Sequence, residues 1–447
     1  MTDNYLLTTP FAVKLYQEVA QSLPIIDYHN HLCVEDIVSD RLFETVTQLW
    51  ISADPYKHRA MRILGVAEHY ITGSASDFEK FEKWYTCLPR LVGNPLYDWS
   101  MMEFSSIFGI RLSPFTAPAS QVFEEANRKL KTLSTKTLLA QFHIEYCAPC
   151  ASLNDPLAPF LELPFCAPSL RGDDIVAVNA AFLEKLNATT GKQITTLQDF
   201  RDAIEARLSC FMEAGCRFTD HALDDGFRFV PDDGKNEARF AQIRAGKELD
   251  LPDRTALSSY ILTMLGQLYA KHSLVMQLHI GAKRSTSTRL RRIAGPAGGY
   301  AAIGNCVDVA SLTGLLDSIE AAGRLPKTVL FTLNPADNAV MSVLSGSYSA
   351  DGCEAIVSQG PAWWWCDHYQ GMTDMLEHLS CYGIASTFVG MTTDSRSLLS
   401  FVRHDYFRRV LCQWIGAKVS QGVLPGDMAL LGDLVKRMCY QNAKNML

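Results

Sequence analysis

Short apolar runs that end in polar residues alternate with helical patterns along the chain. Residues 273–278 are apolar and β-prone and run into His279, and residues 23–26 run into the polar stretch 27–31. Between such runs apolar residues recur at helical spacing, most clearly over residues 255–270. Alternating strands and helices predict a parallel sheet in an α/β protein.

The same arrangement recurs at three further places. Residues 215–218 run into Asp220, residues 328–333 into Asn334, and residues 386–391 into Asp394. Polar residues gathered after buried strands are typical of a (β/α)8 barrel of the TIM type, whose loops after the strands build the site. An open doubly wound sheet is the alternative, although no glycine-rich fingerprint follows the first strand.

One connection is too long for a loop of such a barrel. About 110 residues separate His31 from the next predicted strand, where a handful is usual. Ser76 and Glu79 form a capping box ahead of an apolar helical face. We therefore predict a mostly helical insertion at residues 36–140, over the mouth of a barrel built from residues 1–35 and 141–447. Its aromatic content leaves room for an interface, and we expect a homo-oligomer.

Composition narrows the class of protein. Of 447 residues 48% are hydrophobic and 20% charged, which excludes a disordered chain. The net charge of -7 disfavours binding to nucleic acid or to an anionic membrane. The thirteen cysteines are scattered, no secretory signal is visible, and no uncharged stretch is long enough to span a bilayer. These features predict a cytoplasmic protein.

The pair His29 and His31 is the strongest local signal of chemistry. Residues i and i+2 of a strand face the same way, so both imidazoles can reach one ion. His279 and Asp394 follow two other strands, and a barrel mouth would bring all four together. We predict one divalent metal ion, with zinc a suitable choice for these ligands. The alternative is that each histidine only forms a hydrogen bond with a loop carbonyl.

Other residues have a chemical and a structural interpretation. Arg171 and Arg396 can each grip a carboxylate, or form surface ion pairs. The tryptophans at 363–365 can stack on a sugar or pack in the core. Cys147 and Cys150 form one CxxC with no second pair, which argues against a structural zinc site.

Several longer segments together resemble a known family. They are DYHNHL at Asp27, EHYITGSASDFEKFE at Glu68, VGNPLYDWSMMEF at Val92, GCRFTDHALD at Gly215, MQLHIGAKRSTSTR at Met276, KTVLFTLNPADN at Lys327, GPAWWW at Gly360 and VGMTTDSRSLLSFVRHDYFRR at Val389. They occur in order over nearly the whole chain. On them the chain is identified as a member of the uronate isomerases (glucuronate isomerases) of the amidohydrolase superfamily.

The resemblance implies a (β/α)8 barrel with a helical insertion, and an aldose–ketose isomerase. The implied substrates are small uronic acids, with D-glucuronate converted to D-fructuronate and D-galacturonate to D-tagaturonate through an enediol. It implies metal ligands His29, His31, His279 and Asp394. Arg171, Arg396 and Trp364 would bind substrate, and Asp394, Tyr56 and His29 would take part in catalysis.

The chain departs from the family pattern at one place. Where the family has Asp-His-Tyr, this chain has Asp54, Pro55 and Tyr56, and His58 stands where the family has a tryptophan. Proline cannot transfer a proton. We therefore expect His58, or a water molecule, to replace the missing histidine at the substrate.

Two other functions remain open from the sequence. A metal site of this kind can activate water, so a hydrolase of a sugar-acid lactone or amide is the first alternative. A non-catalytic protein that binds acidic sugars is the second.

Overall fold

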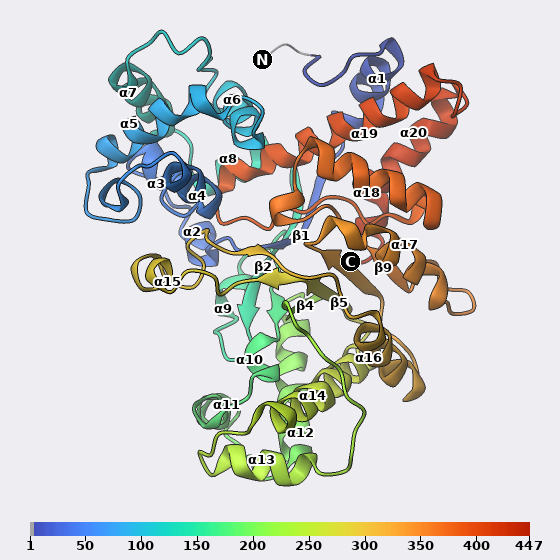
Figure 1. Ribbon diagram of the computed structural model, residues 1–447. Coiled ribbons are helices and arrows are strands. Elements are labelled where there is room, and N and C mark those ends of the chain that lie inside the picture. Colours follow the sequence, from blue (N-terminus) through green and yellow to red (C-terminus); the bar gives the residue numbers. More distant parts are fainter. Residues whose placement is uncertain (1–3) are drawn as a thin grey trace.

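The computed structural model describes residues 4–447 and shows a curled parallel sheet surrounded by helices (Figure 1). Seven strands are hydrogen-bonded in the order β1-β2-β3-β4-β5-β8-β9. They are β1 (Ile25–Asn30), β2 (Ile144–Ser152), β3 (Ser169–Arg171), β4 (Phe218–Leu223), β5 (Val275–Ile280), β8 (Thr328–Thr332) and β9 (Val357–Gln359). A small antiparallel pair joins β6 (Ala282–Lys283) to β7 (Ala302–Ile303). The α/β barrel class is confirmed.

The strand predicted at residues 386–391 is wrong. The chain forms a short 3-10 turn at Ala385–Thr387 and has no assigned strand beyond it. Gly390 has a φ of 100° and Asp394 a φ of 46°, values that interrupt an extended strand. The segment still closes the sheet against β1, because Tyr28 Oη donates to the Gly390 carbonyl (2.8 Å) and His31 N donates to the Ser395 carbonyl (2.9 Å).

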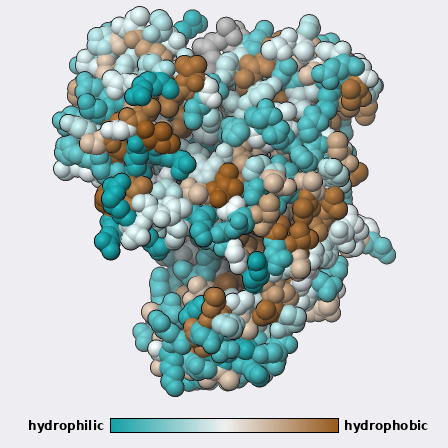
Figure 2. All heavy atoms as spheres, viewed as in Figure 1, coloured by the Kyte–Doolittle hydropathy of each residue, from teal (hydrophilic) through white to brown (hydrophobic). Residues whose placement is uncertain are grey.

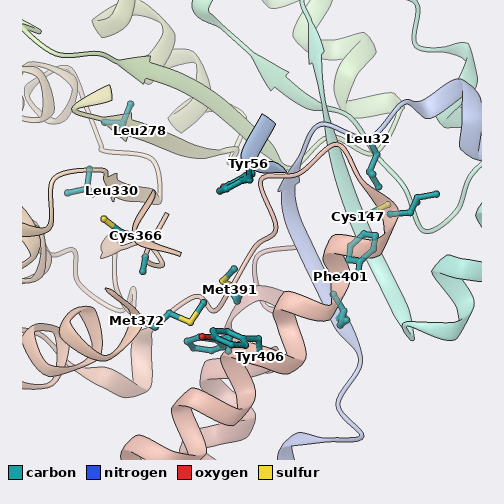
Figure 3. Close-up of a cluster of buried hydrophobic side chains, with 14 of the residues drawn as sticks. Leu32, Tyr56, Cys147, Leu278, Leu330, Cys366, Met372, Met391, Phe401 and Tyr406 are labelled. Carbon is teal, nitrogen blue, oxygen red and sulfur yellow. The ribbon is translucent and has the colours of Figure 1, made fainter. Parts of the chain in front are cut away.

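The strands alternate between two apolar layers, as a pleated strand requires. Ile26, Tyr28, Phe218, Val329 and Phe331 belong to a cluster inside the barrel. The residues between them along the strands pack outward against the helices. In Figure 3, Leu278 and Leu330 come from neighbouring strands, and Met372 and Tyr406 of the covering helices lie lower in the view. In β2, β4 and β5 this alternation decides which polar side chains point into the barrel. In β1 the register shifts between Asp27 and Asn30, so His29 lies beside His279 although the preceding Tyr28 contacts Phe218 inside the barrel.

Helices occupy the long connection between β1 and β2. They are α2 (Val34–Val38), α3 (Val46–Trp50), α4 (Pro55–Ile63), α5 (Asp77–Cys87), α6 (Pro95–Ile107), α7 (Ala119–Leu130) and α8 (Thr135–Gln141). Helix α5 begins with the expected capping box of Ser76 and Glu79. Figure 1 shows α3, α5, α6 and α7 gathered on one side of the strands. The division of the chain into a barrel and an insertion at residues 36–140 stays a prediction.

The remaining helices cover the outside of the sheet and the two ends of the chain. They are α1 (Pro10–Leu15), α9 (Ala158–Leu161), α10 (Asp173–Val176), α11 (Ala180–Thr190), α12 (Leu197–Glu213), α13 (Asn236–Arg244), α14 (Leu251–Lys271), α15 (Thr288–Ala294), α16 (Val309–Ala321), α17 (Asn338–Ser347), α18 (Tyr369–Tyr382), α19 (Val402–Ser420), α20 (Met428–Lys436) and α21 (Asn442–Lys444). Within residues 4–447, none of the helices is long and apolar enough to cross a membrane.

Candidate active site

The two histidines of β1 meet a carboxylate from the closing segment. His29 Nε2 lies 3.1 Å and His31 Nε2 3.0 Å from the same oxygen, Oδ1 of Asp394. His29 is 2% exposed, while His31 is half-buried at the mouth. The three side chains predicted as metal ligands at residues 29, 31 and 394 therefore converge.

Asp394 reaches this position through an unusual backbone conformation. Its φ of 46° lies in the left-handed region, which costs a non-glycine residue energy. Its amide donates to the His29 carbonyl (3.1 Å), and its Oδ2 accepts from Trp363 Nε1 (2.7 Å). Both ends of the residue are thus held in place.

A fully buried carboxylate, Asp27, holds the segment that precedes Asp394 through hydrogen bonds. It accepts hydrogen bonds from Thr392 Oγ1 (2.9 Å), from the amide (2.7 Å) and the hydroxyl (2.9 Å) of Thr393, and from Asn30 Nδ2 (2.8 Å). His404 Nε2 lies 3.1 Å away. Asp27 therefore joins β1 to the segment that carries Asp394.

His279 and Asp220 enter the site from neighbouring strands. On β4, Asp220 lies two residues beyond the inward Phe218, and on β5 His279 lies four residues beyond the inward Val275. Strand alternation therefore points both into the barrel. His279 Nδ1 is 2.6 Å from Asp220 Oδ1, while its Nε2 is buried without a hydrogen-bond partner among the described residues.

Cys150 is a further sulfur donor in the site. It follows the inward Tyr146 and Ala148 on β2 at steps of two, so it also points inward. Its Sγ lies 3.6 Å from His29 Nδ1 and 3.9 Å from Asp220 Oδ2. Cys147, three residues earlier, faces the opposite layer, so the CxxC pair does not act as one unit.

These donors suit a divalent metal ion. Two groups of three have ligand atoms within 4.8 Å of one another: His29 with His31 and Cys150, and His29 with Asp220 and His279. Imidazole, carboxylate and thiolate are the ligands that zinc and similar ions prefer. The orphaned Nε2 of His279, which costs energy in a buried site, fits the same interpretation.

The charges of the site are strongly coupled. Burial alone would raise the pKa of Asp394, but hydrogen bonds from His29 and His31 outweigh it and hold this pKa well below its usual range. The pKa of Asp220 is also lowered well below its usual range, because the charges of His279 and His29 outweigh its burial. Both carboxylates are therefore ionised at neutral pH.

Three arginines line the cavity, and the two predicted from the sequence, Arg171 and Arg396, differ in their ion pairing. Arg171 is paired with Asp173 (2.9 Å) and with Asp220 (3.5 Å). Arg396 is exposed and forms no ion pair or side-chain hydrogen bond within residues 4–447. Arg396 is thus the cation available to an anionic ligand.

Aromatic side chains form another wall. Tyr56 of α4 is buried, and its hydroxyl has no hydrogen-bond partner among the described residues. Trp363 and Trp364 both line the cavity, and only Trp363 contacts Asp394. Of these three, the sequence had singled out Tyr56 and Trp364.

His58 lies elsewhere. Among the described residues the cavity is lined by Pro55 and Tyr56 of α4, but His58 does not reach it. His58 is 6% exposed, and burial lowers its pKa to about 4. On the helix, His58 is two residues from Tyr56 and so projects from a different side. This position gives no support to a role for His58 at the substrate.

Asp220, Cys150 and Trp363 were named from the sequence without being assigned to the site, and Arg284 was not singled out. All four lie in or beside the cavity. Asp220 and Cys150 could have been found by extending the inward alternation of their strands to the end. Arg284 forms an ion pair with Asp224 at 2.8 Å and lies over the Trp364 ring at 5.7 Å. Its position comes from a loop that no periodic pattern describes.

Comparison with known proteins agrees with this geometry. The family model described as glucuronate isomerase matches residues 1–447. A uronate isomerase of Caldanaerobacter subterraneus is 37% identical, over 100% of this chain and 99% of that protein. One from Bacillus licheniformis is 38% identical, over 100% of this chain and 97% of that protein.

Comparison with a solved structure agrees with these sequence comparisons. The uronate isomerase of Thermotoga maritima has a TM-score of 0.93 and 29% identity, and the match covers 100% of this chain and 99% of that one. Sequence and structure are therefore similar along the whole length. The chain belongs to the glucuronate isomerase family.

Proposed function

We propose that this protein is a uronate isomerase. It converts D-glucuronate to D-fructuronate and D-galacturonate to D-tagaturonate. The observation that carries the proposal is the convergence of His29, His31, His279 and Asp394 with the unpaired Arg396 in one cavity, in a chain that matches the family from end to end.

The site needs a cation as well as these side chains. We propose one divalent ion, zinc, held by His29, His31, His279 and Asp394. When bound, such an ion polarises a substrate oxygen and stabilises negative charge on it. Metal analysis of the purified protein would check its identity.

The substrate carboxylate would bind Arg396. A guanidinium offers two parallel N–H donors to a carboxylate, and Arg396 has no competing carboxylate within the described chain. Arg171 already has two acidic partners, Asp173 and Asp220. It would therefore donate to a substrate hydroxyl group, or share its positive charge between these aspartates and the substrate. The cavity therefore has one end, at Arg396, whose free positive charge suits the substrate carboxylate.

Proton transfer falls to Asp394 and Tyr56. Isomerisation removes the C2 proton and returns it to C1 through a cis-enediol, which needs one base near both carbons. Asp394 is held at both ends beside the two histidines, so its carboxylate is positioned to move that proton. The unpartnered Tyr56 hydroxyl would exchange a proton with a substrate hydroxyl group. Trp364 would pack against the sugar.

Pro55 at the cavity wall leaves ring opening of the pyranose to another group. Its ring cannot exchange a proton, and His58 is buried outside the cavity. Water admitted at the open mouth beside Arg396 would replace the histidine.

Proton NMR of the protein with each uronate in D₂O tests the proposal. The matching ketouronate should appear, with deuterium at C1 if the base exchanges with solvent. Release of acid from a sugar lactone, with no ketose from either uronate, would instead indicate the hydrolase.

A further inference from the structure

Cys150 lies at the centre of the donor cluster without a role in the reaction just described. Strand β2 places it there, since Cys150 is in register with Ser169 of β3 and the preceding Pro149 is in register with Asn30 of β1. It is half-buried, and its sulfur is 3.6 Å from His29 Nδ1. A side chain directed inward at this point therefore lies against His29 and Asp220.

The two nitrogens of His29 face different partners. Nε2 lies 3.1 Å from Asp394 Oδ1, the oxygen that His31 Nε2 also approaches. Nδ1 lies on the other edge of the ring, beside Cys150 Sγ. A neutral imidazole that binds a metal through Nε2 carries its proton on Nδ1, and that proton needs an acceptor. Among the described residues, Cys150 Sγ is the polar atom in contact with Nδ1, at 3.6 Å.

We propose that Cys150 is a positioning residue of the metal centre: its sulfur accepts the Nδ1–H of His29 and thereby presents Nε2 to the metal. The inference rests on the metal centre proposed above. Sulfur is a weak acceptor, so a distance of 3.6 Å is long for oxygen but normal for this pair. Asp220 Oδ2, 3.9 Å from the sulfur, fixes the thiol from its other side and links it to the carboxylate beside His279.

Two substitutions test the hydrogen-bond acceptor at residue 150 separately from the volume of its side chain. Cys150→Ser keeps an acceptor, whereas Cys150→Val keeps an apolar side chain of similar size and removes it. Groups that orient a metal ligand typically change metal affinity about 10–100-fold. We expect Cys150→Val to weaken Zn²⁺ binding by this factor, measured by competition with a chromophoric chelator, and Cys150→Ser to recover most of it. Cys381→Ala, on an exposed cysteine of α18, is the matched control and should bind Zn²⁺ as the wild type does.

Cobalt substitution shows whether the sulfur touches the metal. A thiolate ligand gives Co²⁺ a strong sulfur-to-metal absorption in the near ultraviolet, which a sulfur bonded only to His29 does not. We expect the Co²⁺ form of the wild type to lack that absorption. Its presence, and its loss in Cys150→Ser, would overturn the proposal by making Cys150 a direct ligand.

The remaining outcomes are also decisive. Equal Zn²⁺ affinity of wild type and Cys150→Val, with the melting temperature of the metal-free proteins unchanged, would overturn the proposal. If Cys150→Val fails to fold, Cys150→Ala takes its place in the same comparison. A wild type that binds no divalent ion would overturn both this inference and the metal centre. Ketose formation in the NMR experiment would still establish the isomerase.

Discussion

Arg396 faces the cavity with its guanidinium unpaired, although most charged side chains around it have partners. Because a charge-assisted hydrogen bond contributes about 1.5–3 kcal/mol, losing one contact of a bidentate pair weakens binding by roughly 10–100-fold. We therefore expect Arg396→Lys, which keeps the charge but not the fork, to raise KM for D-glucuronate by about that factor and to change kcat less. Steady-state kinetics of ketose formation measures both.

Arg437→Lys is the control for this prediction, since Arg437, which directly follows α20, pairs with Asp433 of that helix, and neither residue lines the cavity. It should leave both constants unchanged. An Arg396→Lys enzyme with the KM of the wild type would mean that the carboxylate binds elsewhere.

The Asp27 side chain is fully buried and accepts four hydrogen bonds, from Thr392, Thr393 and Asn30. Asp27→Asn replaces one acceptor oxygen by a donor, so a buried donor of Thr393 or Thr392 is left unpaired. That loss costs about 1–3 kcal/mol of unfolding free energy. Because the segment that carries Asp394 is then released, we also expect weaker metal binding.

The pH dependence of this loss has a definite sign. Although burial raises the pKa of Asp27, His404 and Thr393 lower it more, and the folded pKa lies below the ordinary 3.8. The stabilisation is thus present above about pH 4 and disappears as the pH falls through the folded pKa. Urea unfolding of wild type and Asp27→Asn at several pH values should show the difference shrinking below pH 4. A constant difference would contradict the assignment.

At the scale of elements, the amphipathic helices were predicted closely and the strands less well. The pattern at residues 255–270 corresponds to α14 (Leu251–Lys271). Helices depend on a period that is visible in a short window. The strand at 386–391 failed because Gly390 and the buried partners of Asp27, not local β propensity, decide the path of that segment.

Helix α12 offers a test of local structure away from the site. It begins with a capping box in which Thr196 accepts from the amide of Asp199, and Asp199 accepts in return from the amide of Thr196. Thr196→Ala removes the cap and should lower the unfolding free energy by about 1 kcal/mol, with kcat unchanged.

Thr189→Ala on α11 is the comparison for that prediction, because its hydroxyl only bonds to the Lys185 carbonyl within the same helix. Its unfolding free energy should change much less. If the two variants were equally stable, the capping box would contribute nothing.

At the scale of the whole molecule, the pattern of strand ends predicted that His279 and Asp394 join the two histidines of β1, but it did not assign Asp220 or Cys150 to the same cluster. His29 and His31 are two residues apart, so strand geometry alone predicts that they share a face. Alternation predicts that Asp220 and Cys150 point inward, but the pairing between strands is needed to place them beside His29 and His279. The burial of His58 in α4 depends on tertiary packing that its local pattern does not show. Figure 2 shows hydrophobic residues in several separate clusters on one face. Ile63 and Val92, exposed within residues 36–140, are consistent with the homo-oligomer, which stays a prediction.

His58 gives a prediction about the stability of the whole protein. Burial lowers its pKa from 6.5 to about 4, so the folded protein holds His58 neutral at pH 7. A base whose pKa is lower in the folded than in the unfolded state contributes stability above pH 6.5, and this stability is lost as the pH falls toward 4. The shift corresponds to a few kcal/mol, on the order of 3. His58→Gln removes the titrating group, so it should flatten the fall in unfolding free energy between pH 6.5 and 4, measured by urea unfolding.

His69→Gln, at a largely exposed histidine of the same region, is the control and should keep the slope of the wild type. Because His58 lies outside the cavity, kcat of His58→Gln at pH 7 should remain within a few-fold of the wild type. A loss of kcat with normal stability would return His58 to the active site, in the place of the family histidine that Pro55 replaces.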